Sequence, residues 1–183
     1  MRITIVGRGG VGSGLAGLLK ESGHDVSPLG REGGDASGAD VVVLAVPGDS
    51  IADALAKVEG LSGQPVLDAT NPTRGRPDGV SSLAHQVKSL TNAPVAKAFN
   101  ANFARLYGEL GAAGKRPSSL YCADDEAREV AEQLTSDAGY EPVYAGGLEN
   151  AAALEDFVTQ LMLPVMMQGR GPFFYRLAAP GEL

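Results

Sequence analysis

The sequence predicts an α/β protein with a Rossmann-like, doubly wound and mostly parallel sheet, ending in a C-terminal helix. Three observations lead to this fold class. Short apolar runs alternate with segments of helical spacing, these runs are apolar on both faces, and a glycine-rich turn follows the first run. The 183 residues (1–183) are expected to form a single dinucleotide-binding domain, whose C-terminal helical segment spans about 148–175.

The first elements follow from the apolar pattern and from glycine. Ile3–Val6 (ITIV) is a β-branched run typical of a buried strand. Val11–Glu21 carries apolar residues at helical spacing, and Gly23 ends that helix. Asp25–Leu29 predicts a second strand, which Pro28 weakens.

The rest of the chain continues this alternation of strands and helices. Further strands are predicted at Val41–Val46, Pro65–Ala69, Pro94–Phe99, Ser118–Ala123 and Pro142–Tyr144. Further helices are predicted at Ile51–Val58, Ser82–Leu90, Asp124–Ala138 and Leu148–Met167. We expect the last helix to be kinked at Pro164, because proline lacks the N–H group that an inner helical turn needs.

The turn Gly7–Gly12 (GRGGVG) fits the pattern G-x-G-x-x-G, and it joins a predicted strand to a predicted helix. In that context the first glycine makes the tight turn, the second admits a pyrophosphate, and the third lets helix and strand pack closely. The helix N-terminus would offer N–H groups to the phosphates. We therefore expect the cofactor to bind at Gly7, Arg8, Gly9, Gly10, Val11 and Gly12. A glycine-rich turn without a ligand is the alternative.

The residue that selects NAD or NADP is expected at the end of the second strand. No carboxylate ends this strand, and Arg31 follows just after it. An arginine there suits a 2′-phosphate, so the expected cofactor is NADP(H). Glu32 leaves NAD open, and a solvated loop charge is the alternative reading of Arg31.

The connection between the second and third strands is unusually short. Only eleven residues, four of them glycine and none in a helical pattern, separate Leu29 from Val41. A parallel crossover commonly contains a helix, so we expect Gly30–Asp40 to form a loop that leaves the adenosine side of the site more open. One alternative to an ordinary cofactor site is therefore a site that binds its cofactor weakly. Another is a degenerate or regulatory nucleotide-binding protein without turnover.

Charge and composition exclude several functional classes. A net charge of −7 without a Lys/Arg cluster argues against nucleic-acid binding. One cysteine and two histidines are too few for a Cys/His metal site, so no metal is expected. Glu155, Asp156 and Gln160 interrupt the longest apolar stretch, so no membrane span is expected. The lone Cys122 and the lack of a signal-peptide pattern favour a cytoplasmic location.

Five further segments carry a resemblance to a known family. They are VVVLAVP at Val41–Pro47, DATNP at Asp68–Pro72, VAKAFN at Val95–Asn100, SLYCADDEAREVAEQL at Ser119–Leu134 and GYEPVYAGGLENAAALE at Gly139–Glu155. With the glycine turn, they resemble the NADP oxidoreductase family that includes the deazaflavin-dependent (coenzyme F-420) enzymes. The chain is also similar to the cytoplasmic domain of the six-transmembrane metalloreductases.

This resemblance implies one Rossmann-like domain, in which NADPH exchanges hydride with a deazaflavin or flavin-like carrier near the nicotinamide. Val46 and Pro47 would then contact the cofactor, Asn71 would lie at the end of the next strand, and Lys97–Asn100 would border the nicotinamide. The residues after Asn100 (ANFARLYGE) differ from the threonine-containing loop of many relatives. The identity of the second substrate therefore stays open.

Lys97 and Asn100 are the candidate catalytic residues. Hydride transfer between two carriers mainly requires two rings held together without water. An NADP-dependent reductase of a small carbonyl or imine compound, the other alternative, would also need a proton donor, for which Lys97 is the candidate. The alternative for Lys97 is a structural role, in which it ends a strand and donates to a loop carbonyl. Asn100 would act as a donor to the nicotinamide amide or a substrate oxygen, or would form a turn.

The C-terminal segment is rich in methionine and aromatic residues. Leu161–Met167 suits core packing, a wall of the carrier pocket or a homodimer face. Phe173, Phe174 and Tyr175 would cover the carrier ring or seal a dimer. The expected partners are thus a small-molecule redox carrier and, through this segment, a second copy of the chain.

Overall fold

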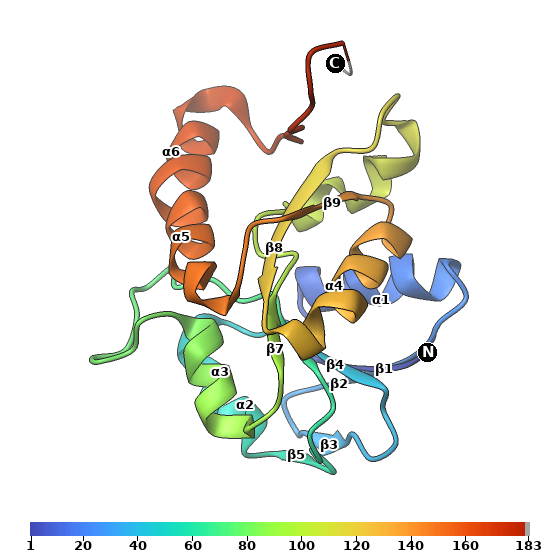
Figure 1. Cartoon of the computed structure of the whole chain (residues 1–183), viewed down its shortest axis with the longest axis vertical. Coiled ribbons are helices and arrows are strands. Elements are labelled where there is room, and N and C mark those ends of the chain that lie inside the picture. The colour runs from blue at the N-terminus through green and yellow to red at the C-terminus, as the bar shows by residue number, and fades with distance from the viewer. Residues whose placement is uncertain (182–183) are drawn as a thin grey trace.

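The computed structural model of the protein describes residues 1–181. Its main sheet has seven strands in the order β2-β1-β4-β6-β7-β8-β9. Neighbouring strands are parallel except for β7 and β8, which confirms the mostly parallel sheet (Figure 1). The strands are β1 (Arg2–Val6), β2 (Asp25–Leu29), β4 (Val41–Leu44), β6 (Val66–Asp68), β7 (Val95–Lys97), β8 (Ser118–Ala123) and β9 (Glu141–Tyr144).

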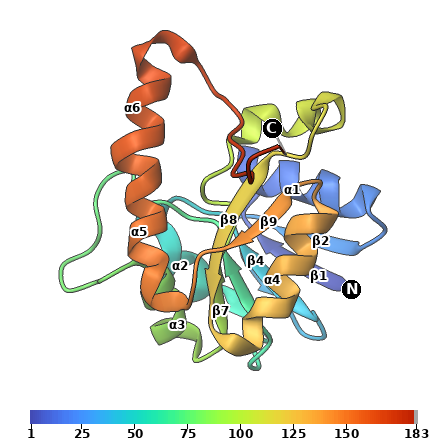
Figure 2. The same ribbon diagram turned by 45° about the horizontal axis from the view of Figure 1, so that its top comes forward.

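Helices cover both faces of this sheet, as predicted for a doubly wound fold. Figures 1 and 2 show α1 (Gly10–Glu21) and α4 (Asp125–Asp137) on one side, and α2 (Ile51–Leu55), α3 (Leu83–Thr91) and α5 (Ala151–Asp156) on the other. Alternate residues of a strand face opposite sides, so each strand supplies two hydrophobic cores. In β4, for example, Val41 and Val43 join the α1 and α4 core, and Val42 and Leu44 join the opposite one.

The predicted C-terminal helix is present, but its turns vary in width. After α5, π-helical turns at Phe157–Met162 lead into α6 (Leu163–Val165), and a second π-helical stretch spans Met166–Arg170. The predicted kink at Pro164 is replaced by a wider turn just before it, which accommodates a residue without an N–H group. The backbone leaves helical geometry later, at Gln168 and Gly169.

The crossover between β2 and β4 contains no helix, as expected from its glycines. Its regular structure is β3 (Gly34–Asp35), which pairs with β5 (Val58–Glu59) in a separate two-stranded sheet. Gly33 has φ of +80°, and a Cβ there would collide with the carbonyl of Lys57, so only glycine fits. Because the chain turns into β5, helix α2 ends at Leu55, before the predicted end at Val58.

A 3₁₀ helix at Ala104–Ala112 is another element that the sequence did not predict. It packs close to α1, where a Cβ on Gly14 would collide with the ring of Tyr107. Within residues 1–181, no helix is long and apolar enough to cross a membrane.

Candidate cofactor and substrate site

The glycine turn has the geometry that a pyrophosphate site needs. A Cβ on Gly7, whose φ is +116°, would collide with the carbonyl oxygen of Ala45, and a Cβ on Gly12 would collide with the carbonyl oxygen of Gly7. These two glycines are therefore required by the packing of the turn itself. A Cβ on Gly9 would meet no protein atom within 4 Å, so this face of the turn is open to a ligand.

Helix α1 begins at this turn without a side-chain cap. Gly9 is its N-cap residue, and the first backbone bond of the helix runs from the N–H of Ser13 to the carbonyl of Gly9 (2.9 Å). The N–H groups of Gly10, Val11 and Gly12 thus have no partner inside the helix. Since the first turn also carries no acidic residue, it can accept an anion.

Arg8 reaches from the turn to the end of β2. Its guanidinium donates to the carbonyl of Pro28 through Nε (3.3 Å) and Nη2 (3.0 Å), and Nη1 pairs with Glu32 (3.3 Å). Arg31 is exposed beside them, and among the described residues its guanidinium has no ion-pair partner. The Arg8–Glu32 pair and the neighbouring residue Arg31 therefore lie at the end of β2, where the adenosine ribose of a dinucleotide would lie.

Val46 and Pro47 follow β4 and stand next to the glycine turn, because Val46 Cγ1 lies 3.3 Å from the position of a Cβ on Gly7. Asn71 lies near them, since a Cβ on Gly48 would come within 2.7 Å of the Asn71 carbonyl oxygen. The structure thus brings the residues predicted at the ends of β1, β4 and β6 together at one edge of the sheet.

A cleft of about 180 Å³ opens at this edge. Val11 of the glycine turn contributes to its wall, so the cleft adjoins the N-terminus of α1. Its lining is mostly apolar and includes no acidic or basic side chain: Val11, Ala69, Asn71, Thr73, Phe99, Asn100, Ala101, Asn102, Phe103, Ala104, Val158, Met162 and Leu163.

Asn71 and Asn100 form the polar part of this cleft. The side-chain amide of Asn71 donates to the Asn100 carbonyl (2.7 Å), and the amide of Asn100 donates to Asn71 Oδ1 (3.1 Å) and to the carbonyl of Leu154 (3.2 Å). Both hydrogens of the Asn100 amide are therefore bonded within the protein, which does not support the donor role expected for Asn100. Its Oδ1 is buried and has no partner among the described residues.

The backbone at Phe99 adds a feature that the sequence did not reveal. Phe99 is buried with φ of +63°, a left-handed conformation that costs a non-glycine residue roughly 1–2 kcal/mol. Such strain is concentrated at functional sites. Here it turns the chain between β7 and Asn100, at the wall of the cleft.

Lys97 does not line the cleft. Its side chain is fully buried, and Nζ contacts Asp68 Oδ2 (2.6 Å), the carbonyl of Thr70 (2.9 Å) and Glu155 Oε1 (3.0 Å). Three oxygens satisfy the three N–H groups of an ammonium. This is the geometry of a structural ion cluster, and it does not support the role of proton donor expected for Lys97.

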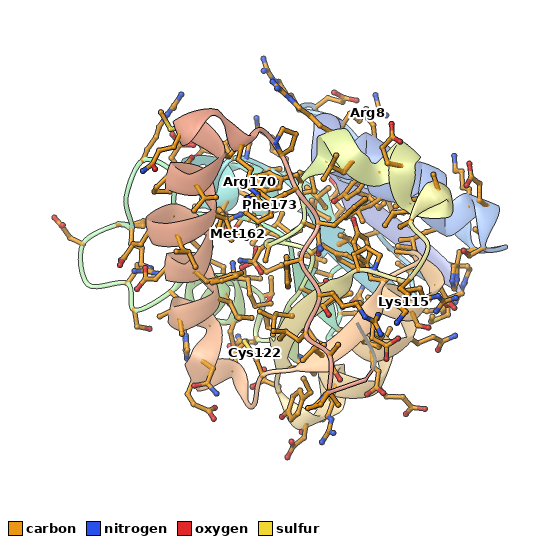
Figure 3. The ribbon with its side chains drawn as sticks, turned by 90° about the horizontal axis from the view of Figure 1, so that it is seen from above. Arg8, Lys115, Cys122, Met162, Arg170 and Phe173 are labelled. Atoms are coloured by element: carbon orange, nitrogen blue, oxygen red, sulfur yellow. The ribbon has the colours of Figure 1, made fainter. Side chains whose placement is uncertain are left out.

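The C-terminal segment forms the wall opposite the glycine turn. Val158, Met162 and Leu163 line the cleft from the helix. The chain then folds back, and Phe173 packs edge-on against Phe103, with 5.4 Å between ring centroids. Figure 3 shows Met162 and Phe173 close together between the helix and this returning strap. Phe173 and Tyr175 thus pack on their own chain, Tyr175 against Phe157.

In the described part of the chain, no group of three or more histidine, cysteine or carboxylate side chains is placed to hold a metal ion. The lone Cys122 is buried in β8, and burial raises the pKa of its thiol to about 12.

No protein-family model matches the chain, and no curated protein matches it. Among solved structures, it is similar to a chain from Arthrobacter sp. FB24 with a provisional assignment as an F420-dependent NADP reductase. The two are 26% identical with a TM-score of 0.78, over 98% of this chain and 100% of that one. A hypothetical protein from Sinorhizobium meliloti is 27% identical with a TM-score of 0.68, over 83% of this chain and 87% of its own.

More distant structures share the fold. The reductive aminase from Aspergillus terreus, solved in complex with NADPH and ethyl levulinate, is 16% identical with a TM-score of 0.66. The match covers 92% of this chain and 62% of the aminase. The Rossmann-like fold class is thus confirmed. The resemblance to F420-dependent NADP reductases, first indicated by the motifs, is confirmed over nearly the whole length of the chain.

Proposed function

We propose that this protein is an NADP(H)-dependent oxidoreductase that transfers hydride between NADP(H) and a deazaflavin or flavin-like carrier. The oxidoreductase class is supported by the likeness to NADP-dependent reductases. The carrier is our inference from the site. It depends above all on one observation, a glycine cradle for a pyrophosphate that opens directly into an apolar cleft without acidic or basic side chains.

The residues of the site have separable tasks in this reaction. The cofactor, when bound, supplies the hydride chemistry of its nicotinamide ring. The N–H groups at the start of α1 hold its phosphates, and the open face of Gly9 leaves them room. Asn100 Oδ1, which is buried without a partner among the described residues, would accept a hydrogen bond from the carboxamide of the ring. Phe103 and Met162, which line the cleft, would help to exclude water from it.

Reduction of a small carbonyl or imine compound is less favoured. That reaction needs a proton delivered to the substrate inside the cleft. The cleft is lined by amides, a threonine and apolar groups, and Lys97 is saturated by three oxygens behind it. Hydride transfer to a deazaflavin or flavin-like ring could draw the accompanying proton from solvent, so it would require no side-chain acid in the cleft.

NADP(H) is our proposal over NAD(H), because Arg8 and Arg31 both stand at the end of β2. A 2′-phosphate would be attracted by both guanidinium groups. Glu32, which pairs with Arg8, opposes that preference and is the residue that keeps NAD open.

A homodimer and a cytoplasmic location remain proposals. Leu161 (53% exposed) and Met167 (80% exposed) leave apolar surface on the C-terminal helix, which favours a second copy as its cover. Sedimentation of the purified protein would test this. A monomer at all concentrations would contradict it.

The cofactor site is best tested with Gly9→Ala. The φ and ψ of Gly9 are −74° and −174°, which alanine adopts freely, and its methyl would meet only the ligand. We expect the variant to melt like the wild type but to bind NADPH at least about tenfold more weakly in a nicotinamide fluorescence titration. The control is Gly17→Ala, which also has open space around its Cβ but lies further along α1.

Wild-type affinity and turnover complete the test. Absence of NADPH and NADH binding at millimolar concentration would contradict any enzymatic function of this site. If NADPH binds, initial rates with oxidised deazaflavin, FMN and ferric chelates identify the carrier. Turnover of small carbonyl or imine compounds alone would refute the proposed carrier reaction.

A further inference from the structure

A cluster of buried ions lies behind the cleft, and the proposed chemistry makes no use of it. Asp68 ends β6, Lys97 ends β7, and Glu155 belongs to α5; all three side chains are completely buried. Glu155 also accepts from the N–H of Leu83 (2.8 Å), at the start of α3. The cluster therefore ties two strands and two helices together next to the cleft.

The fourth member of the cluster comes from a loop. Arg76 donates through Nε to Glu155 Oε2 (2.8 Å), and through Nη2 to Asp156 Oδ1 (2.8 Å) and the carbonyl of Ala152 (3.1 Å). Although burial opposes it, these carboxylates hold the pKa of Arg76 above its ordinary value. A planar guanidinium in this fork resists displacement by water, because several charge-assisted bonds must break together.

Arg76 connects two walls of the cleft. The loop 71–80 carries Asn71 and Thr73, which line the cleft on one side. Helix α5, to which Arg76 is bonded, continues into Val158 and Met162 on another side. Through the Arg76 fork, the position of the loop and the position of the helix depend on each other.

The loop itself supplies little rigidity. Gly75 and Gly79 have φ of +95° and +75°, and no protein atom lies near either Cβ position. A second arginine of the loop, Arg74, pairs with Asp49 at 2.8 Å, but its side chain is 81% exposed. Exposed pairs of this kind contribute only about 0–1 kcal/mol, so the anchor at Arg76 dominates.

We propose that Arg76 is a positioning residue. It holds the loop 71–80 against α5 and thereby sets the width of the cleft in which the ring of the deazaflavin or flavin-like carrier would bind. This inference rests on the proposed function and adds the residue that fixes where the ring sits. Loss of Arg76 leaves Glu155 with Lys97 and the Leu83 N–H, so no buried charge is stranded. The fold should therefore survive the substitution.

The test compares Arg76→Gln and Arg76→Lys with the matched control Arg74→Gln on the same loop. With NADPH and the better carrier of FMN and deazaflavin, we expect Arg76→Gln to raise the carrier KM about tenfold, as the loss of charge-assisted bonds implies. The Kd for NADPH should rise by a clearly smaller factor than the carrier KM, because the glycine turn is untouched and only the bonds between Asn71 and Asn100 link the loop to the nicotinamide end. Arg76→Lys should recover part of the loss, and Arg74→Gln should match the wild type.

Hydrogen exchange gives a readout that needs no turnover. Amides of residues 71–83 and of α5 should exchange faster in Arg76→Gln than in wild type, and not in Arg74→Gln. Unchanged exchange with unchanged carrier KM overturns the inference, and so does a rise of the NADPH Kd in parallel with the carrier KM. If Arg76→Gln fails to fold, the test uses Arg76→Lys. Amide exchange rates of Arg76→Lys equal to those of the wild type then overturn the inference. If the wild type binds no NADPH, the proposed function fails, and the exchange result still decides the role of Arg76.

Discussion

Replacement of Lys97 by methionine separates a structural role from a catalytic one. The substitution keeps the length of the side chain but removes its charge from a site without exposed surface. Asp68 keeps a bond from the Thr70 N–H (2.8 Å), and Glu155 keeps Arg76 and the Leu83 N–H. The loss of one partner of a buried ion pair typically costs about 3–5 kcal/mol.

That cost can be converted into a melting temperature. For a domain of this size, each kcal/mol lowers the melting temperature by roughly 2–4 °C, so Lys97→Met should melt about 6–20 °C below the wild type. Lys88→Met is the matched control. Lys88 pairs with Asp124 at the same 2.6 Å distance, but 48% of its side chain is exposed. We expect this control to lose less than about 1 kcal/mol.

The assay is thermal unfolding followed by circular dichroism, with initial rates measured well below both transitions. The reasoning is refuted if Lys97→Met melts like the wild type. If the variant melts like the wild type and its kcat falls by about 10²–10⁴-fold, which is the effect of losing a general acid, Lys97 is a proton donor despite its burial.

Three further outcomes are expected. Arg31→Ala should weaken NADPH binding several-fold more than NADH binding in fluorescence titrations; equal losses for the two would remove the basis for preferring NADP. Glu32→Gln frees Arg8 from its carboxylate partner and should tighten NADPH binding by about two- to fivefold at low salt, with a smaller gain at high salt, and weaker NADPH binding would contradict this. Burial raises the pKa of the Cys122 thiol to about 12, so at pH 8 almost no reactive thiolate is present, and iodoacetamide should label Cys122 only after unfolding. Rapid labelling of the native protein would disprove its burial.

The sequence predicted those parts of the molecule that depend on neighbouring residues. A β-branched run followed by glycines has few structural solutions, so the strand, the turn and the start of α1 could be placed from Ile3 to Gly12. The missing crossover helix followed from glycine content in the same way. The pairing of β3 with β5 did not, because two-residue strands leave no apolar pattern.

The ion cluster could not be predicted because its partners are distant in the chain. Arg76 and Glu155 are 79 residues apart, and Asp68 and Lys97 are 29 apart. In the sequence, Glu155 interrupts an apolar stretch and ends a family-like segment, and neither observation indicates a buried ion pair. A carboxylate within a helix face that is otherwise apolar was the available signal, since such a group must find a buried cation. The hydrogen bonding of Asn100 likewise depends on a distant residue, Leu154, whose carbonyl takes one hydrogen of the Asn100 amide.

The antiparallel direction of β8 determines which part of the chain covers the cleft, and so where substitutions can change it. Because β8 runs against β7, its first residues lie beside the cleft, where Ser118 and Ser119 bond Asn102. Ser118 also bonds the returning C-terminal strap, through its N–H to the Tyr175 carbonyl and through Oγ from the Leu177 N–H. The nucleotide cradle is thus built from the front of the chain, and the cover of the cleft from its end. Substitutions after Ala151 would reshape this cleft while every contact of the glycine turn is retained, so the cleft and the proposed phosphate-binding turn can vary separately.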